Sequence, residues 1–266
     1  CDLAPNVQQT YIVAGQPWTP RNSNRRRYGE MVPLKWGLAQ SNNWITAYLM
    51  SKLSPQAFVS LLREYGFNNP EIHPSMSLCL GPCDLTVAEM VSAYTTFVNH
   101  GIRCAPLFVT KIEDNEGNVI AQFQPRMNEV ISEESANKML YMRKGVVDGG
   151  TASRLRFKYN FTGEIAAKTG TTNNNSDAWF MGFTPTLVSG VWVGGDDRDI
   201  HFDSMQMGQG ATMALPIWAN YMRRVFSDSR LGYGEGAVFD LPEGYNPCET
   251  SEIDVTDVND IEEVFE

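Results

Sequence analysis

The sequence GEIAAKTGTTNNNSDAWFMGFTPTLVSGVWVG, at residues 163–194, decides the fold class of this chain. It contains three short apolar runs, at about 162–168, 178–184 and 187–194, and turns with Gly, Asn and Pro separate them. Short apolar runs bounded by such turns are typical of β-strands, and short turns join antiparallel neighbours. The stretch therefore predicts three consecutive strands that pair in an antiparallel sheet.

Helical patterns lie on both sides of this stretch. The best defined begins with Thr86-x-x-Glu89, a capping box in front of an apolar run, and Gly101 is expected to end it. Further helices are predicted at 31–40, 44–53, 55–66, 132–149 and 211–226, and a β-hairpin at 107–123. Helices followed by antiparallel strands with helices beside them indicate the α+β class, an antiparallel sheet flanked by helices.

Charge and composition divide the chain into three parts. The 266 residues include 21 basic and 31 acidic side chains, for a formal net charge of −10. Eight of the acids lie between Glu249 and Glu266, so the rest of the chain is nearly neutral. We expect an irregular segment at 1–29, one domain body at 30–228, and a Gly/Pro linker with an acidic tail at 229–266.

Composition also excludes several classes of function. An acidic chain repels phosphate backbones, which weighs against a nucleic-acid binder. No apolar run approaches the roughly 18 residues that a membrane-spanning helix needs. Five cysteines, an odd number, do not make a disulfide framework. Because Cys79-x-x-x-Cys83 lacks the spacing of a zinc knuckle, we expect packing or one local disulfide there, and no metal or cofactor.

The motif Lys168-Thr169-Gly170-Thr171 stands at the end of a predicted strand. A lysine next to hydroxyls and a small residue suits the binding of a carboxylate, and Gly170 would let a substrate backbone lie against the strand. The backbone N–H of Thr171 could face a developing oxyanion. Taken alone, the motif fits a strand that ends in a turn equally well.

The motif Ser41-Asn42-Asn43 lies between two predicted helices. Its hydroxyl can shuttle a proton, and its second amide can both donate and accept hydrogen bonds. Taken alone, it fits an ordinary helix N-cap, because Ser and Asn are common cap residues.

Together, the two motifs carry a resemblance that neither carries alone. Ser-x-Asn followed by Lys-Thr-Gly is the order found in penicillin-recognising serine acyltransferases. The surrounding blocks lie at 18–22, 37–43, 93–101, 168–173, 177–185, 190–194 and 214–218. From about Trp18 to Arg224 the chain resembles the transpeptidase domain of class A (bifunctional) penicillin-binding proteins, and this implies the penicillin-binding/β-lactamase-like transpeptidase fold.

The resemblance also implies a reaction, partners and a location. A serine would attack the penultimate D-alanine of a peptidoglycan stem peptide, and an amine from a neighbouring stem would then form the cross-link. Stem peptides, the lipid-linked wall precursor and β-lactams would be the ligands. The intact protein would lie at the extracytoplasmic face of the bacterial membrane, with a membrane anchor and a glycosyltransferase domain upstream.

The resemblance assigns a role to each motif residue. Ser41 would relay a proton to the leaving amine, and Asn43 would hold the acyl-side amide and help to orient the lysine of the nucleophile motif. Lys168 would set the electric field near Ser41 and the substrate carboxylate. Thr169 and Thr171 would bind that carboxylate, and the N–H of Thr171 would form half of an oxyanion hole.

The nucleophile motif of the family, Ser-x-x-Lys, is missing from its expected place. No Ser or Thr before Ser41 has a Lys three residues later, so we expect the domain to be N-terminally incomplete and this chain alone to be inactive. Ser135-Ala136-Asn137-Lys138 has the right spacing. It comes after Ser-x-Asn, however, and lies in a charged stretch typical of a surface helix, so we do not expect it to be the nucleophile.

Two alternatives stay open at this point. One is a non-catalytic module of the same fold that binds wall peptides or a partner, and the missing nucleophile motif motivates it. The other is a hydrolase of the same superfamily, a D,D-carboxypeptidase or a β-lactamase-like enzyme.

Overall fold

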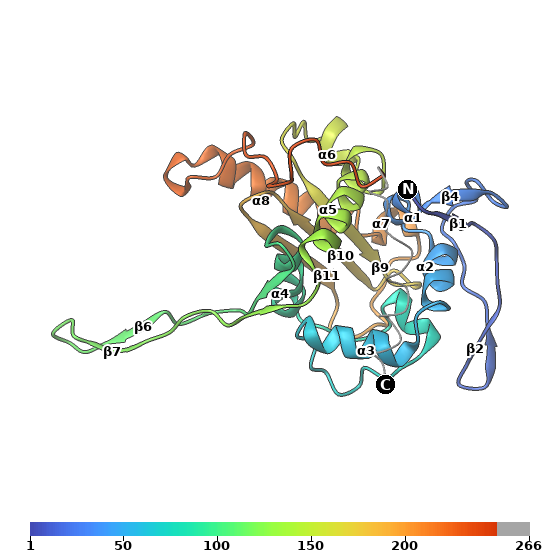
Figure 1. Cartoon of the computed structure of the whole chain (residues 1–266), viewed down its shortest axis with the longest axis horizontal. Helices are drawn as coiled ribbons and strands as arrows, with labels where there is room; N and C mark the ends of the chain where they lie inside the picture. Colours follow the sequence, from blue (N-terminus) through green and yellow to red (C-terminus); the bar gives the residue numbers. More distant parts are fainter. Residues whose placement is uncertain (249–266) are drawn as a thin grey trace, which may run out of the picture.

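The computed structural model describes residues 1–248, so the acidic end of the expected tail lies outside the described residues. Its centre is the antiparallel sheet that the sequence predicted (Figure 1). The strands are β9 (Ala166–Thr171), β10 (Asp177–Phe183) and β11 (Val188–Gly194), in the spatial order β11-β10-β9. This arrangement puts β9, which ends in the Lys-Thr-Gly motif, at the edge of the sheet.

Helices account for most of the remaining body, and several begin where the sequence predicted. They are α1 (Leu34–Ala39), α2 (Asn43–Met50), α3 (Pro55–Glu64), α4 (Val87–Val98), α5 (Glu133–Asp148), α6 (Arg154–Phe157), α7 (Met205–Gly208) and α8 (Ala214–Ser227), with 3₁₀ turns η1 (Met76–Leu80) and η2 (Ser229–Leu231). The capping box in front of α4 is formed on both sides, by Thr86 and Glu89. The mixed architecture confirms the predicted α+β class.

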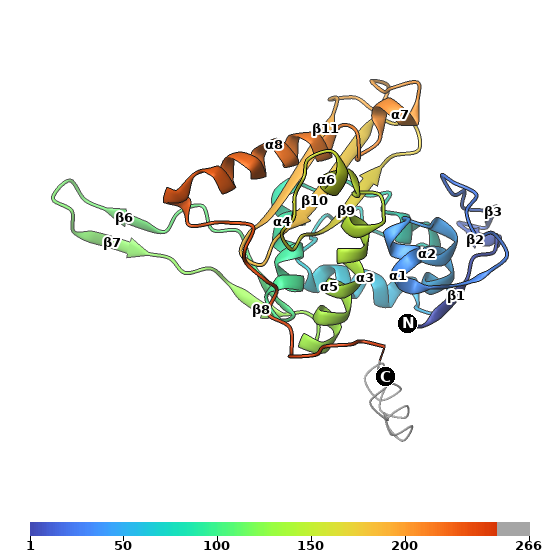
Figure 2. The same cartoon turned by 90° about the horizontal axis from the view of Figure 1, so that it is seen from above.

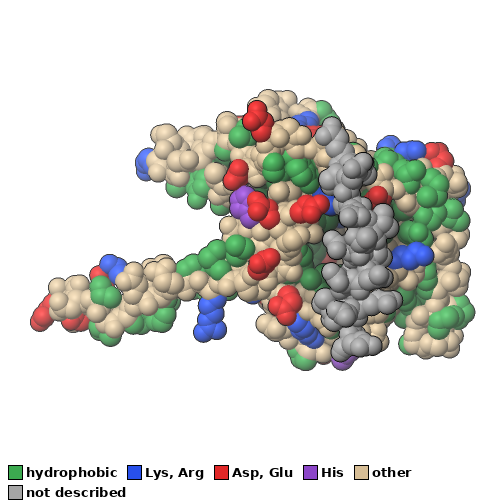
Figure 3. Space-filling view, in the orientation of Figure 1, with side chains coloured by type: hydrophobic (Ala, Val, Ile, Leu, Met, Phe, Trp, Pro, Cys, Tyr) green, Lys and Arg blue, Asp and Glu red, His purple; other side chains and the backbone are tan. Residues whose placement is uncertain are grey.

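Short two-stranded ladders complete the fold. Strand β1 (Leu3–Pro5) pairs with β4 (Met31–Pro33), β2 (Tyr11–Val13) with β3 (Gln16–Trp18), β5 (Ile102–Cys104) with β8 (Met127–Glu129), and β6 (Lys111–Glu113) with β7 (Val119–Gln122). The hairpin of β6 and β7 is the one predicted at 107–123, and it projects from the body as a long arm (Figures 1 and 3).

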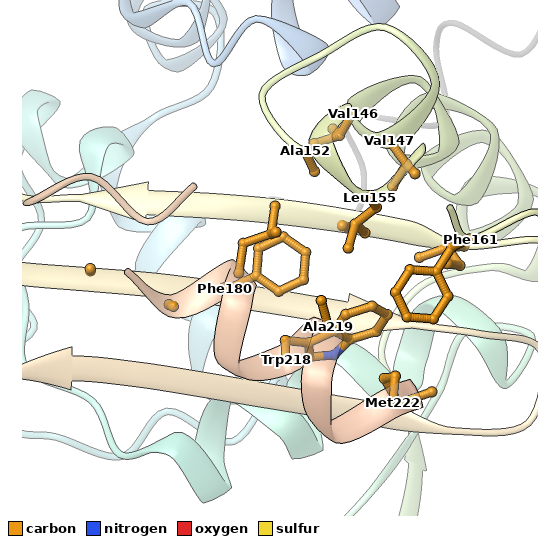
Figure 4. Packing of buried hydrophobic residues seen from close by; sticks show 14 residues of the cluster. Val146, Val147, Ala152, Leu155, Phe161, Phe180, Trp218, Ala219 and Met222 are labelled. Carbon is orange, nitrogen blue, oxygen red and sulfur yellow. The ribbon is translucent and has the colours of Figure 1, made fainter. Parts of the chain in front are cut away.

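The sheet is covered on both faces, as Figure 2 shows. Helix α8 packs on one face, where Trp218 is fully buried and its ring centroid lies 5.3 Å from that of Phe180 (Figure 4). Gly182 makes this packing possible, since a Cβ there would lie 2.5 Å from the Trp218 ring. Helices α4 and α5 cover the other face, α4 through the aromatic residues Tyr94 and Phe97 and α5 through Leu140.

The chain after α8 packs back across the body (Figure 2). The Glu235 carboxylate accepts hydrogen bonds from the backbone N–H groups of Thr162 and Gly163. Phe239 packs on the α4 side of the sheet, and its N–H donates to Glu164. The described part of the segment 229–266 is therefore attached to the body at several points.

The cysteines are arranged differently from what the sequence suggested. A disulfide joins Cys1 to Cys248, with the two Cα atoms 5.2 Å apart, while Cys79 and Cys83 are half-buried free thiols. The expectation of a local disulfide at Cys79 and Cys83 is therefore wrong, and packing is the alternative that holds. Within residues 1–248, no group of three His, Cys, Asp or Glu side chains is placed to hold a metal ion, and no helix is long and apolar enough to cross a membrane.

Candidate functional site

Ser41 lies in the tight connection between α1 and α2. Its φ of 52° is in the left-handed region, which is uncommon for a residue with a Cβ and is enriched at functional sites. The N-cap of α2 is Asn42, whose buried side chain accepts from the N–H groups of Trp44 and Ile45. The cap is thus filled by the middle residue of the motif, which leaves the Ser41 hydroxyl for another partner.

That partner is Lys168, 127 residues further along the chain. Its Nζ donates to the Ser41 Oγ at 2.7 Å and to the carbonyl oxygen of Thr169 at 2.8 Å. Because Lys168 lies opposite Met181 in the sheet, its side chain leaves β9 on the face that α4 and α5 cover. The fold therefore brings the first residue of one motif against the first residue of the other.

The surroundings of Lys168 change its acidity. Burial first, and then the positive charge of Arg143, together lower the pKa of its ammonium group to about 8. An amine with such a pKa exchanges protons close to neutral pH, which is what acid–base catalysis requires of its participants.

Thr169 and Thr171 lie on the other face of β9, since side chains alternate along a strand. The Thr169 hydroxyl is 2.7 Å from the hydroxyl of Thr151, and the Thr151 N–H binds the carbonyl oxygen of Ala39 at the end of α1. The Thr171 hydroxyl accepts from the N–H of Gly210 at 3.0 Å. Both hydroxyls therefore fasten β9 to its neighbours, and their expected contact with a substrate carboxylate stays a prediction.

Gly170 lies in the middle of the motif, between these residues. A Cβ at this position would lie 3.0 Å from the side chain of Trp179, so a larger residue would crowd that ring. Among residues 1–248, no strand pairs with the outer edge of β9. An extended peptide could therefore add to this edge by backbone hydrogen bonds.

Asn43 contacts the segment that precedes α1, and no contact joins it to Lys168 among the described hydrogen bonds. Its Nδ2 donates to the carbonyl oxygen of Arg21 at 2.6 Å, and its backbone N–H donates to Asn22 at 2.7 Å. An open groove of about 460 Å³ lies next to this contact and is lined by Gln8, Arg21, Asn22, Arg25, Tyr28 and Trp44. The structure thus brings Ser41 and Lys168 together and leaves Asn43 at the border of a separate groove.

The second Ser-x-x-Lys, Ser135 to Lys138, forms an ordinary helix start. Ser132 caps α5 by accepting from the N–H of Ser135, and Ser135 is exposed. Lys138 pairs with Glu134 at 2.5 Å on the surface. Neither side chain lies at the site that Ser41 and Lys168 form.

Arg143 and Thr151 are residues of this region that the sequence reasoning did not single out. Arg143 carried a usable signal, because it occupies the apolar stripe of α5 together with Ala136, Leu140 and Val147. A cation at a buried helical position is unusual enough to mark a candidate. Thr151 carried no such signal, since its partners come from distant parts of the chain.

Comparison with known proteins gives consistent matches. Residues 6–195 match the family described as penicillin binding protein transpeptidase domain. Penicillin-binding protein 1A of Aquifex aeolicus is 36% identical over 211 residues, 79% of this chain and 28% of that protein. Penicillin-binding protein 1B of Vibrio cholerae is 34% identical over 223 residues, 84% of this chain and 28% of that protein. The chain thus spans about 28% of the length of these curated relatives.

Solved structures show the same fold. Penicillin-binding protein 1A from Haemophilus influenzae matches with a TM-score of 0.75 and 27% identity, over 85% of this chain and 39% of that one. PonA1 from Mycobacterium tuberculosis, in complex with penicillin V, matches with a TM-score of 0.69 and 25% identity, over 88% of this chain and 64% of that one.

Proposed function

Because this chain belongs to the penicillin-binding protein transpeptidase family, we propose that it is part of a class A enzyme that cross-links peptidoglycan stem peptides. The contact of Lys168 with Ser41 is the observation that supports this most directly. A serine and a buried lysine of lowered pKa, meeting beside an open strand edge, suit proton transfer during acyl transfer.

The nucleophile of the proposed enzyme is a serine encoded upstream of Cys1. The longer protein that carries it is called the parent protein below. The serine attacks the carbonyl carbon of the penultimate D-alanine, an ester bond forms, and the terminal D-alanine leaves as an amine that takes up a proton through Ser41. An amine from a second stem peptide then attacks the ester, which forms the cross-link and returns the serine hydroxyl.

The other motif residues bind and orient the donor peptide. Lys168 attracts the terminal carboxylate of the substrate, and the hydroxyls of Thr169 and Thr171 donate to it. The N–H of Thr171 stabilises the oxyanion in the tetrahedral intermediate. Asn43 holds the amide on the acyl side, which requires its side chain to exchange its present contact with Arg21 for the substrate.

The proposed assignment to a class A transpeptidase also implies the ligands and the cellular location of the parent protein. Stem peptides, the lipid-linked wall precursor and β-lactams are the proposed ligands, and PonA1, a relative, is described in complex with penicillin V. The parent protein lies at the extracytoplasmic face of the membrane, held by an upstream anchor next to a glycosyltransferase domain. The chain 1–266 alone has no activity in this proposal.

A hydrolase and a non-catalytic module are the competing functions. The contact between Ser41 and Lys168 argues against the module, because a protein that only binds has no need of a buried lysine of lowered pKa. Incubation of the parent protein with wall precursors distinguishes the transpeptidase, the hydrolase and the non-catalytic module. We expect cross-linked dimers together with released D-alanine; D-alanine released without any dimers would indicate a hydrolase, and no release at all would indicate the module.

A further inference from the structure

Arg143 is a buried cation without an anionic partner. Only 8% of the residue is exposed, and among residues 1–248 no carboxylate pairs with it. Its guanidinium lies over the rings of Tyr94 and Phe97, 4.6 and 4.4 Å from their centroids, and donates to the Tyr94 hydroxyl at 3.0 Å. Its Nε has no hydrogen-bond partner within the described part of the chain. Because burying an unpaired charge costs free energy, this arrangement calls for an explanation.

The position of Arg143 relative to β9 suggests one. Tyr94, which holds the guanidinium, belongs to the same packed cluster as Ala166 and Met181. Ala166 precedes Lys168 by two residues on the same face of β9, and Met181 lies directly opposite Lys168 on β10. Helix α5 therefore carries its buried cation to the side of the sheet from which Lys168 extends.

Other charged groups on the surrounding elements are already engaged. The contacts are Lys35 of α1 over the Tyr141 ring, Lys144 of α5 with Glu164, Asp148 of α5 with Arg156, Glu89 of α4 with Thr86, and Asp177 of β10 with Trp192. Arg143 is the buried cation of α5, and the contacts found for it among residues 1–248, with Tyr94 and Phe97, bring no negative charge. Its positive charge is therefore not neutralised by direct contact with a carboxylate of the described residues.

We propose that Arg143 is a positioning residue whose fixed positive charge brings Lys168 close to proton exchange with Ser41. A charged Lys168 only donates to Ser41, whereas a neutral one accepts the hydroxyl proton and leaves the Ser41 oxygen free to take a proton from the nucleophile. The Ser41 hydroxyl proton passes to the Lys168 amine, and the proton of the nucleophile replaces it on Ser41, so the protons balance. The lowered pKa of Lys168, with Arg143 as its second cause after burial, supports the proposal.

The inference rests on the proposed role of Lys168 in catalysis, but its test does not. The pKa of Lys168 is measured in the full 266-residue chain by NMR titration of its labelled side chain. In Arg143→Met, the pKa of Lys168 is expected to rise by about one unit, because a like charge disfavours the protonated amine. Arg143→Lys keeps the charge and is expected to restore the wild-type value.

Lys138→Met is the matched control, since it removes a positive charge from the exposed face of the same helix. It should leave the pKa of Lys168 unchanged, because exposed charges are screened.

Equal pKa values of Lys168 in wild type and Arg143→Met would overturn the proposal, as would an ordinary pKa in the wild type. If Arg143→Met does not fold, Arg143→Gln replaces it, since its amide retains a donor for Tyr94. A parent protein inactive towards wall precursors would overturn the proposed function and leave this result standing.

Discussion

Replacing Lys168 with alanine in the parent protein is expected to slow acylation by benzylpenicillin about 10²- to 10⁴-fold, the usual contribution of a positioned acid–base group. The substitution removes the 2.7 Å contact with Ser41 and the positive charge beside the strand edge where substrate is expected to bind. The second-order acylation rate constant, measured with a fluorescent penicillin, reports the effect.

Two variants sharpen the test of Lys168. Lys168→Arg keeps a positive charge but cannot give up its proton near neutral pH, so we expect it to remain slow. Lys138→Ala removes an exposed lysine that lies apart from the site. This variant should be acylated at the wild-type rate. The loss of a positioned acid–base group usually slows a reaction far more than about threefold. An acylation rate constant of Lys168→Ala within about threefold of wild type would therefore show that Lys168 has no role in the mechanism.

Trp218→Ala is expected to lower the free energy of unfolding by about 3–5 kcal/mol, the range measured for large aromatic side chains removed from a core. Trp218 is fully buried between Phe161 and Phe180, and Gly182 leaves room for its ring (Figure 4). Urea denaturation of the 266-residue chain measures the change.

The neighbouring residue provides the control for Trp218. Ile217 lies on the same turn of α8 but is 51% exposed, so Ile217→Ala should change stability by no more than about 1 kcal/mol. A comparable loss in both variants would show that α8 contributes through its helical backbone and not through the ring of Trp218.

Local patterns explain which parts of the fold could be predicted. The strands around Lys168 and the helix start at Thr86 depend on residues close together in sequence, and the structure contains both. The ladder of β1 with β4 and the disulfide of Cys1 with Cys248 depend on residues far apart, and no local pattern announces either. For this reason the sequence predicted an irregular segment at 1–29, although the structure contains the strands β1, β2 and β3 there.

The candidate site shows the same division. Ser41 and Lys168 can be predicted from the sequence because two short motifs occur in the order typical of a family, and the structure brings these two side chains together. The direction of the Asn43 side chain and the fastening of Thr169 to Thr151 follow from packing between distant segments. A sequence names the residues that could react, but it does not say which neighbour each side chain contacts in the folded chain.

We propose that this chain supplies the Ser41 and Lys168 half of an acylation site and that the longer parent protein supplies the nucleophile. Intact-mass spectrometry after incubation with benzylpenicillin tests it most directly, on the chain 1–266 and on the parent protein extended to its Ser-x-x-Lys motif. We expect the parent protein to gain the mass of one penicillin on that serine and the chain 1–266 to stay unmodified. A stable adduct on the chain 1–266, at Ser41 or Ser135, would contradict it, as would a parent protein that takes up no penicillin.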